Sequence, residues 1–244
     1  MSSDISGGTA PHAGLQLNDG LSSHAGMDSC AIVHVCRHGL VENPQQVLYG
    51  RLPGYHLSAV GRAMAERLGE HFANYSLQHL RTSPLERAQE TMAPIAARHP
   101  ELPVQVDWRL IEADSYMQGQ AKGPFSLGMA RPANWHYYLN PARPSWGEGF
   151  TAMGARVLAA IADAGYCAGP GGQAVLVSHQ APIWAARRMA EHKFVFNFPA
   201  MRQCALASVT TFAVELSRWP GEAGASDAVR FVSYDDIMAN QPTA

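Results

Sequence analysis

A chain of 244 residues, of which 47% are hydrophobic and 16% are charged, has the composition of a folded globular protein with ample apolar material for a core. Its formal net charge of −2 excludes the concentrated basic excess of a general nucleic-acid binder. Its four cysteines are too few and too scattered for a disulfide framework, and their spacing matches no zinc motif. We therefore expect reduced, mostly buried thiols in a cytoplasmic protein.

The N-terminal segment differs from the rest of the chain. Residues 1–29 are rich in Ser, Gly, Ala and Asp and contain neither Lys nor Arg, which does not resemble a secretory signal. This composition predicts a flexible tail, followed by a single domain over residues 30–238. No segment of the chain approaches the roughly 18 consecutive apolar residues of a membrane span, so we expect no membrane association.

The first half of the domain alternates strand and helix patterns. Ala31–Cys36 is a short apolar run rich in β-branched residues, as in a buried strand. A helix follows the candidate N-cap Ser58. The buried stripe of this helix is expected at Val60, Met64, Leu68 and Phe72. Residues 78–82 predict a second strand, and SPLE at 83–86 predicts a helix start, with Ser83 as N-cap and Glu86 closing a capping box.

The second half contains a long irregular segment between regular elements. Val104–Trp108 predicts a short strand, and residues 113–149 show no clean periodicity, which is typical of a lid or binding insertion. The next helix is marked by apolar residues at Phe150, Met153, Val157 and Ile161. AVLVS at 174–178 predicts a second buried strand, 182–189 a helix, and 206–214 and 229–234 closing strands. The alternation indicates an α/β fold with a mainly parallel sheet and helices on both faces.

Ionisable residues follow the predicted strands directly. Arg37, His38 and Gly39 end the first strand, and Arg87 lies one turn into the helix after the second. His179 and Gln180 follow AVLVS, and Glu112 comes after the strand at 104–108. Because ligands of open α/β sheets bind at the carboxyl ends of the strands, we expect these side chains to share one site.

This set of residues has a coherent chemical use. Arginine forks bind tetrahedral oxyanions, and helix N-termini supply N–H donors and a favourable dipole. A neutral imidazole can attack phosphorus, and a carboxyl group can protonate the departing oxygen. We expect Gly39 to allow the tight backbone turn that holds His38 at the bottom of a phosphate pocket.

Three motifs give the chain a resemblance to the histidine phosphatase superfamily, which includes the phosphoglycerate mutases. They are RHG at 37–39, SPLERAQET at 83–91 and VSH at 177–179, together with the glutamate of LIEA at 110–113 and the Gly-rich stretch at 50–61. The resemblance implies a three-layer α/β/α sandwich of the phosphoglycerate mutase type. It also implies a metal-independent phosphatase without a cofactor, acting on a small phosphomonoester.

The resemblance assigns roles to individual residues. His38 would be the nucleophile that becomes phosphohistidine, and Glu112 the proton donor, with Asp114 as the alternative because the segment ADSYMQGQ departs from the family pattern. The phosphoryl oxygens would be bound by Arg37, Arg87, His179, Asn43 and the backbone N–H of Gln180. Arg51 could reach phosphate or hold a surface turn. Glu148 and His34 are interpreted as structural.

The motifs leave some alternatives open. A phosphomutase shares the phosphohistidine, and a non-catalytic phosphate-ligand sensor could use the same fold. An unrelated nucleotide-binding protein would need a GxGxxG or GxxxxGK[ST] loop, which the sequence lacks. The aromatic residues at 135–138 and 146, with Arg131 and Arg143, either pack the insertion or line a substrate pocket. The oligomeric state is left open between a monomer and a homodimer.

Overall fold

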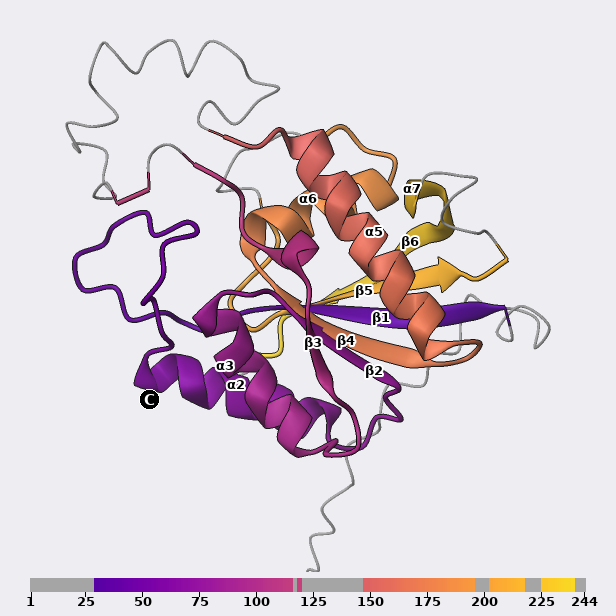
Figure 1. Cartoon of the computed structure of the whole chain (residues 1–244), viewed down its shortest axis with the longest axis horizontal. Helices are drawn as coiled ribbons and strands as arrows, with labels where there is room; N and C mark the ends of the chain where they lie inside the picture. Colours follow the sequence, from indigo (N-terminus) through magenta and orange to yellow (C-terminus); the bar gives the residue numbers. More distant parts are fainter. Residues whose placement is uncertain (1–28, 116–117, 120–146, 196–201, 218–224, 240–244) are drawn as a thin grey trace, which may run out of the picture.

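The apolar run of the RHG motif forms a central strand of the sheet, β1 (Cys30–Arg37), which is paired on both sides. The computed structural model describes residues 29–115, 118–119, 147–195, 202–217 and 225–239 (Figure 1). Within them the strands form a six-stranded sheet in the order β3-β2-β4-β1-β5-β6. The other strands are β2 (His79–Thr82), β3 (Val104–Val106), β4 (Gln173–Ser178), β5 (Val209–Glu215) and β6 (Val229–Asp235).

The strand directions confirm the predicted mainly parallel sheet. The pairings β1·β4, β2·β4 and β2·β3 are parallel, whereas the closing strands β5 and β6 add two antiparallel pairings at one edge. The helices are α2 (Ala59–Phe72), α3 (Glu86–Ala97), α5 (Phe150–Ala168), α6 (Gln180–Ala190), the short α7 (Ala225–Ala228) and the 3-10 turn η1 (Trp108–Leu110). The carboxyl ends of β1, β2, β3 and β4 therefore lie at one edge of the sheet.

The two faces of the sheet bury two separate apolar clusters. Val33 and Val35 of β1 pack on one face with α5 and α6, whereas Cys36 packs on the other with α2 and α3. This alternation follows from the period of two along a strand. Figure 1 shows α2 and α3 on one side of the sheet and α5 and α6 on the other, so the predicted three-layer α/β/α arrangement is confirmed.

Helix α2 begins as predicted, and Leu68 and Phe72 of the predicted buried stripe are fully buried. The Ser58 hydroxyl caps it by accepting from the backbone N–H of Gly61 at 3.0 Å. Val60 is 55% exposed, so its place in the predicted buried stripe was wrong. The other buried residues of α2 are Gly61, Ala65 and Gly69. Position 61 requires a glycine because a Cβ atom there would lie 1.9 Å from the carbonyl oxygen of Leu40.

Helix α3 begins later than the capping box predicted. Its first residue is Glu86, its N-cap is Leu85, and no side chain caps it. The Glu86 carboxylate accepts instead from the backbone N–H of Gly54 at 3.1 Å, in the loop after β1. The predicted N-cap role of Ser83 was therefore wrong, because its hydroxyl lies against a histidine of the candidate site.

The remaining boundaries agree with the sequence analysis to within a few residues. The strand expected at 104–108 ends at Val106 and continues as η1, and the strand expected from 206 begins at Val209. The tail at 1–28 and most of the insertion at 113–149, with its aromatic residues and Arg131 and Arg143, lie outside the described residues. In the part that is described, no helix is long and apolar enough to cross a membrane.

Candidate active site

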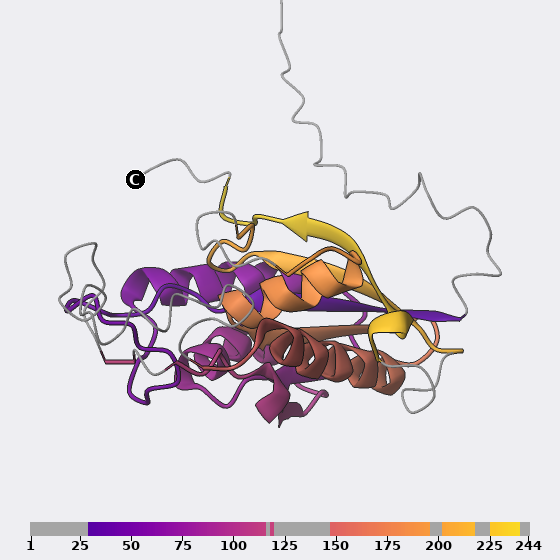
Figure 2. The ribbon, with the colours of Figure 1, turned by 90° about the horizontal axis from the view of Figure 1, so that it is seen from above.

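The three motifs meet at the carboxyl edge of the sheet. The backbone N–H of His38 donates to Ser178 at 3.1 Å, and that of Ser83 donates to Val177 at 3.0 Å. The ends of β1, β2 and β4 are thus tied together by these bonds, which brings residues 38, 83 and 179 to one place. The loop after β1 extends beyond this edge, on the left of both ribbon views (Figures 1 and 2).

The His38 ring is held in one tautomer. Its side chain is 1% exposed, and Nδ1 lies 2.8 Å from the carbonyl oxygen of Gly39. Because a carbonyl oxygen can only accept, Nδ1 carries the proton, and the lone pair of the neutral ring lies on Nε2. Burial lowers the pKa of His38 well below its usual value, and the charges of Arg87 and Arg37 lower it further. The ring is therefore neutral and its Nε2 is nucleophilic at neutral pH.

Gly39 is required for close packing rather than for an unusual backbone angle. It is not among the glycines with positive φ, so the expected conformational reason was wrong. A Cβ atom at this position would lie 2.5 Å from the carbonyl oxygen of Gly61 in α2. The Gly39 N–H also donates to the Thr91 hydroxyl of α3 at 3.1 Å. The loop behind His38 is thus packed directly against both helices.

His179 lies beside His38 and is equally buried. Its side chain is 0% exposed, and the two imidazole ring centroids are 5.1 Å apart. His179 Nε2 and the Ser83 hydroxyl are hydrogen-bonded at 2.7 Å. Burial lowers the pKa of His179 well below its usual value, with further lowering by His38 and Arg87. This ring is also neutral in the unliganded site.

Two arginines surround these rings. Arg87 is 0% exposed; its Nη2 donates to the carbonyl oxygen of Gly50 at 2.6 Å, and its guanidinium lies 4.8 Å from the centroid of the Tyr49 ring. Arg37 donates from Nη1 to the carbonyl oxygen of Cys204 at 2.7 Å. Both guanidinium groups are therefore held in position by backbone carbonyls, which leaves their other N–H groups for a ligand.

Four buried nitrogen atoms of these side chains have no hydrogen-bond partner within the described part of the chain: Arg37 Nε, Arg87 Nε, Arg87 Nη1 and His179 Nδ1. Buried polar groups in native proteins are nearly always paired. Three of these atoms belong to cationic forks that carry only donors. Donors of this kind are suited to binding an oxyanion.

The N-terminus of α6 adds donors to the same edge. Gln180 is the first residue of this helix and His179 is its N-cap, without a side-chain cap bond. The first N–H groups of a helix have no partner within it and carry a partial positive charge. The Gln180 side chain is turned to the carbonyl oxygen of Cys204 at 3.4 Å, so any contact with an anion would come from its backbone N–H.

The two candidate proton donors differ in their surroundings. Burial lowers the pKa of Arg87, and the Glu112 carboxylate opposes this decrease, so Glu112 lies within electrostatic reach of the pocket. Burial raises the pKa of Tyr49, and the Glu112 carboxylate raises it further. Asp114 is exposed, and its carboxylate accepts from Ser115 N–H and the Gln118 amide. Glu112 is the half-buried one of the two, and its carboxylate likewise accepts from the next backbone N–H, that of Ala113, at 2.8 Å.

Asn43 and Arg51 are engaged in holding loops. The Asn43 amide donates to the carbonyl oxygen of Val47 at 2.9 Å and accepts from its N–H at 3.1 Å. Arg51 donates from Nε to the carbonyl oxygen of Glu112 at 2.7 Å and pairs with Glu148 at 3.0 Å. Both side chains therefore fix loops of this region, and Asn43 Nδ2 and Arg51 Nη2 each keep a second N–H beyond these bonds.

The sequence analysis missed four residues at this edge. Ser83 was interpreted as a helix cap, and Thr91, which links α3 to the loop of His38, carries no sequence signal of its own. Arg156 lies in α5, and its charge lowers the pKa of His179. Arg202 precedes β5; burial lowers its pKa, and Glu112 opposes the decrease. The order of motifs gave no indication of the last two, because they follow no strand.

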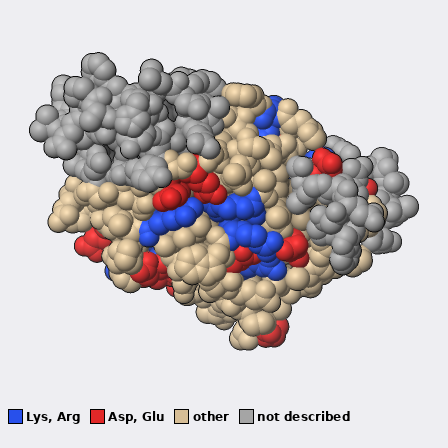
Figure 3. Space-filling model, turned by 45° about the horizontal axis from the view of Figure 1, so that its top comes forward, with Lys and Arg blue, Asp and Glu red and all other residues tan. Residues whose placement is uncertain are grey.

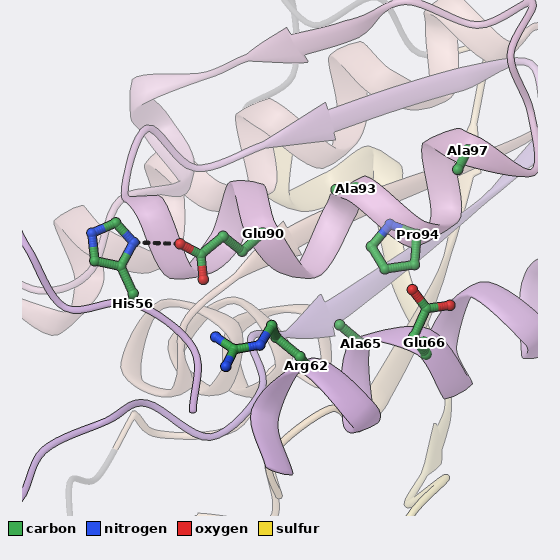
Figure 4. A pocket seen from close by; sticks show the side chains of 8 residues that line it. All are labelled: His56, Arg62, Ala65, Glu66, Glu90, Ala93, Pro94 and Ala97. Carbon is green, nitrogen blue, oxygen red and sulfur yellow. Dashed lines mark hydrogen bonds and ion pairs between the residues drawn. The ribbon is translucent and has the colours of Figure 1, made fainter. Parts of the chain in front are cut away.

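The surface has an open hollow and a cluster of basic side chains. An open hollow of about 640 Å³ between α2 and α3 is bordered by His56, Arg62, Glu66 and Glu90, as Figure 4 shows. Figure 3 shows Lys and Arg side chains gathered in the middle of one face, bordered by Asp and Glu. Among the described residues, no group of three or more His, Cys, Asp or Glu side chains could hold a metal ion.

The fold is that of the phosphoglycerate mutase-like phosphatases. The family model of the histidine phosphatase superfamily (branch 1) matches residues 33–223, and the chain belongs to this superfamily. Uncharacterized protein Rv0525 of Mycobacterium tuberculosis is 44% identical over 186 residues, which cover 76% of this chain and 91% of that protein.

Solved structures of phosphatases share the fold. One is the mycobacterial glucosyl-3-phosphoglycerate phosphatase Rv2419c with inorganic phosphate, which is 25% identical with a TM-score of 0.62 and covers 84% of this chain and 95% of that one. Another is the phosphoserine phosphatase of Entamoeba histolytica with 3-phosphoglyceric acid, which is 17% identical with a TM-score of 0.61 and covers 84% and 97%. Family membership and these neighbours support a phosphatase-type enzyme.

Proposed function

We propose that this chain is a metal-independent phosphatase that hydrolyses small phosphomonoesters through a phosphohistidine on His38. The observation that carries the proposal is the set of four buried, unpartnered nitrogen atoms beside a histidine with its Nδ1 bound to a carbonyl. An oxyanion bound by Arg37, Arg87 and His179 would satisfy those of these nitrogen atoms that face it. Its phosphorus would then lie next to Nε2 of His38.

The reaction proceeds in two steps. In the first, the lone pair of His38 Nε2 forms a bond to phosphorus while the bond from phosphorus to the ester oxygen breaks, and the Glu112 carboxyl group gives its proton to that oxygen. In the second, the Glu112 carboxylate takes a proton from water, whose oxygen attacks phosphorus as the N–P bond breaks. Inorganic phosphate leaves, and both residues return to their initial protonation states.

The arginines supply the charge stabilisation. The phosphoryl group passes through a transition state with negative charge spread over its oxygens, and fixed N–H donors stabilise that charge without rearranging. Arg37 and Arg87 are held by carbonyl groups before any ligand binds, so little reorganisation is needed. Two guanidinium charges and the N-terminus of α6 therefore take the part that a metal ion has in other phosphatases.

We infer the class of substrate from the names of two solved phosphatases with this fold. The neighbouring phosphatases are named for glucosyl-3-phosphoglycerate and phosphoserine, both small phosphomonoesters. A phosphomonoester of similar size is the substrate class we propose here.

Hydrolysis of p-nitrophenyl phosphate in excess EDTA tests the proposal. We expect phosphate release by the wild-type protein and a loss on the order of 10⁴-fold or more in His38→Ala, as for other covalent nucleophiles. His56→Ala, at an exposed histidine paired with Glu90, is the matched control and should keep full activity. Activity that requires a metal, or that survives in His38→Ala, would contradict the proposal. Isomerisation of phosphoglycerates without phosphate release would indicate a mutase instead, and phosphate binding without turnover a sensor.

A further inference from the structure

The backbone of Glu112 is held by two arginines from distant parts of the chain. Arg51, in the loop after β1, donates from Nε to the carbonyl oxygen of Glu112 at 2.7 Å. Arg156, in α5, reaches the same oxygen from Nη2 at 3.5 Å and donates from Nη1 to the carbonyl oxygen of Arg109. The segment that carries the proposed proton donor is thus bound at its main chain from both sides.

One carboxylate joins these two arginines. Glu148 Oε1 accepts from Arg156 Nε at 2.6 Å, and Oε2 accepts from Arg156 Nη2 at 2.8 Å and from Arg51 Nη2 at 3.0 Å. The paired side chains are 17%, 18% and 31% exposed for Arg156, Glu148 and Arg51, so the contacts are largely screened from water. Bidentate arginine–carboxylate pairs of this kind fix direction as well as distance.

The neighbouring backbone brings Glu148 to this position. Gly147 and Ser115 form an antiparallel bridge, and a Cβ atom on Gly147 would lie 1.9 Å from the carbonyl oxygen of Asp114. The residue before Glu148 therefore packs directly against the strand-like segment that follows Glu112. Without the Glu148 charge, the guanidinium groups of Arg51 and Arg156 would repel each other across the same carbonyl group.

We propose that Glu148 is a positioning residue for proton donation: it holds Arg51 and Arg156, and through them the main chain of Glu112. This inference rests on the proposed function, because it assigns Glu112 the protonation of the leaving oxygen. Glu148 does not touch the phosphoryl group. Its loss should therefore impair the protonation of the leaving group and leave phosphate binding and the attack by His38 intact.

Leaving groups of different basicity separate these effects. Glycerol phosphate expels an alkoxide that must be protonated, whereas p-nitrophenyl phosphate expels a phenolate that is stable without a proton. In Glu148→Gln we expect kcat/KM for glycerol phosphate to fall about 100-fold, the effect of a displacement of about 1 Å. For p-nitrophenyl phosphate we expect a fall of less than about threefold. Glu112→Gln should show the same selectivity, and the double variant should be no worse than Glu112→Gln, since residues acting as a unit are not additive.

Glu191→Gln is the matched control. Glu191 is 11% exposed and also pairs with two arginines, Arg187 and Arg188, but at the far end of α6, and its loss should leave both rates unchanged. Equal losses for both substrates in Glu148→Gln, or no loss, would overturn the inference. If circular dichroism shows Glu148→Gln to be unfolded, Arg51→Gln tests the same connection by the same selectivity. A wild-type protein that hydrolyses neither substrate would instead overturn the proposed function, and this inference with it.

Discussion

Replacement of Arg87 by methionine should separate activity from stability. Arg87 is fully buried, and its Nε and Nη1 have no hydrogen-bond partner among the described residues. If one of these N–H groups binds the transferring phosphoryl group, its loss removes a charge-assisted hydrogen bond of about 1.5–3 kcal/mol. This corresponds to a decrease in kcat/KM of about 10- to 160-fold.

The stability of Arg87→Met, in contrast to its activity, should not fall. The variant loses the bond to Gly50 and the contact with Tyr49, together worth about 2–5 kcal/mol. It also removes a buried charge with an effective desolvation penalty of several kcal/mol, and methionine fills much of the space. The two terms nearly cancel, so we expect the free energy of unfolding without phosphate to change by less than about 1 kcal/mol or to increase.

Phosphate links the two measurements. At 100 times its Kd, phosphate should stabilise the wild-type protein by about 2.7 kcal/mol, or roughly 5–11 °C in Tm for a domain of this size. The Tm shift of Arg87→Met should be less than half as large. Arg98→Met, on the same helix with a side chain 30% exposed, should change neither activity nor the phosphate response. Near-wild-type kcat/KM in Arg87→Met, or a large loss of stability with full activity, would refute this reasoning.

Four further predictions concern the surroundings of His38. The pKa of His38 is lowered in the folded state, so at acidic pH the unfolded chain binds one more proton than the folded chain. The free energy of unfolding should therefore fall as the pH drops below about 6.5. In urea titrations, His38→Ala should flatten this pH dependence by up to about 1.4 kcal/mol per pH unit. For the same reason kcat/KM should not decline between pH 7 and 6, and an acid limb at pH 6.5 or above would contradict a neutral nucleophile. Thr91→Val should leave the Gly39 N–H unsatisfied and reduce stability by about 1–3 kcal/mol, whereas Thr91→Ser should not, as measured by chemical denaturation. Gly61→Ala should destabilise the protein although alanine is the better helix former by about 1 kcal/mol, because its Cβ atom would meet the Leu40 carbonyl oxygen; an increase in Tm would show that the loop yields.

Much of the fold could be predicted because the strands follow local rules. The β-branched run before Arg37 and the AVLVS run are apolar on both faces, which only a central strand requires, and both are central. Since the carboxyl ends of parallel strands share an edge, His38 and His179 were expected together, and their rings are 5.1 Å apart. The position of these residues followed from topology alone.

Contacts made across the fold could not be predicted in the same way. Ser83 satisfied every local rule for a helix cap, yet its hydroxyl bonds to His179, 96 residues away in sequence. Val60 fitted the spacing of a buried helical stripe, but it faces solvent because α2 packs at the next residue, Gly61, against the carbonyl oxygen of Leu40. Arg156 reaches the main chain of Glu112 because α5 packs against η1, and no periodicity encodes such a contact.

The central claim is that His38 carries the phosphoryl group during turnover. The most direct test is to mix the protein with p-nitrophenyl phosphate in excess EDTA, quench within the first turnover in alkali, and measure the intact mass and the modified peptide by mass spectrometry. The account predicts one added phosphoryl group on His38 that is stable in alkali and lost in acid, and none in His38→Ala. Turnover with no phosphorylated protein at any time, or with the phosphoryl group on another residue, would contradict it.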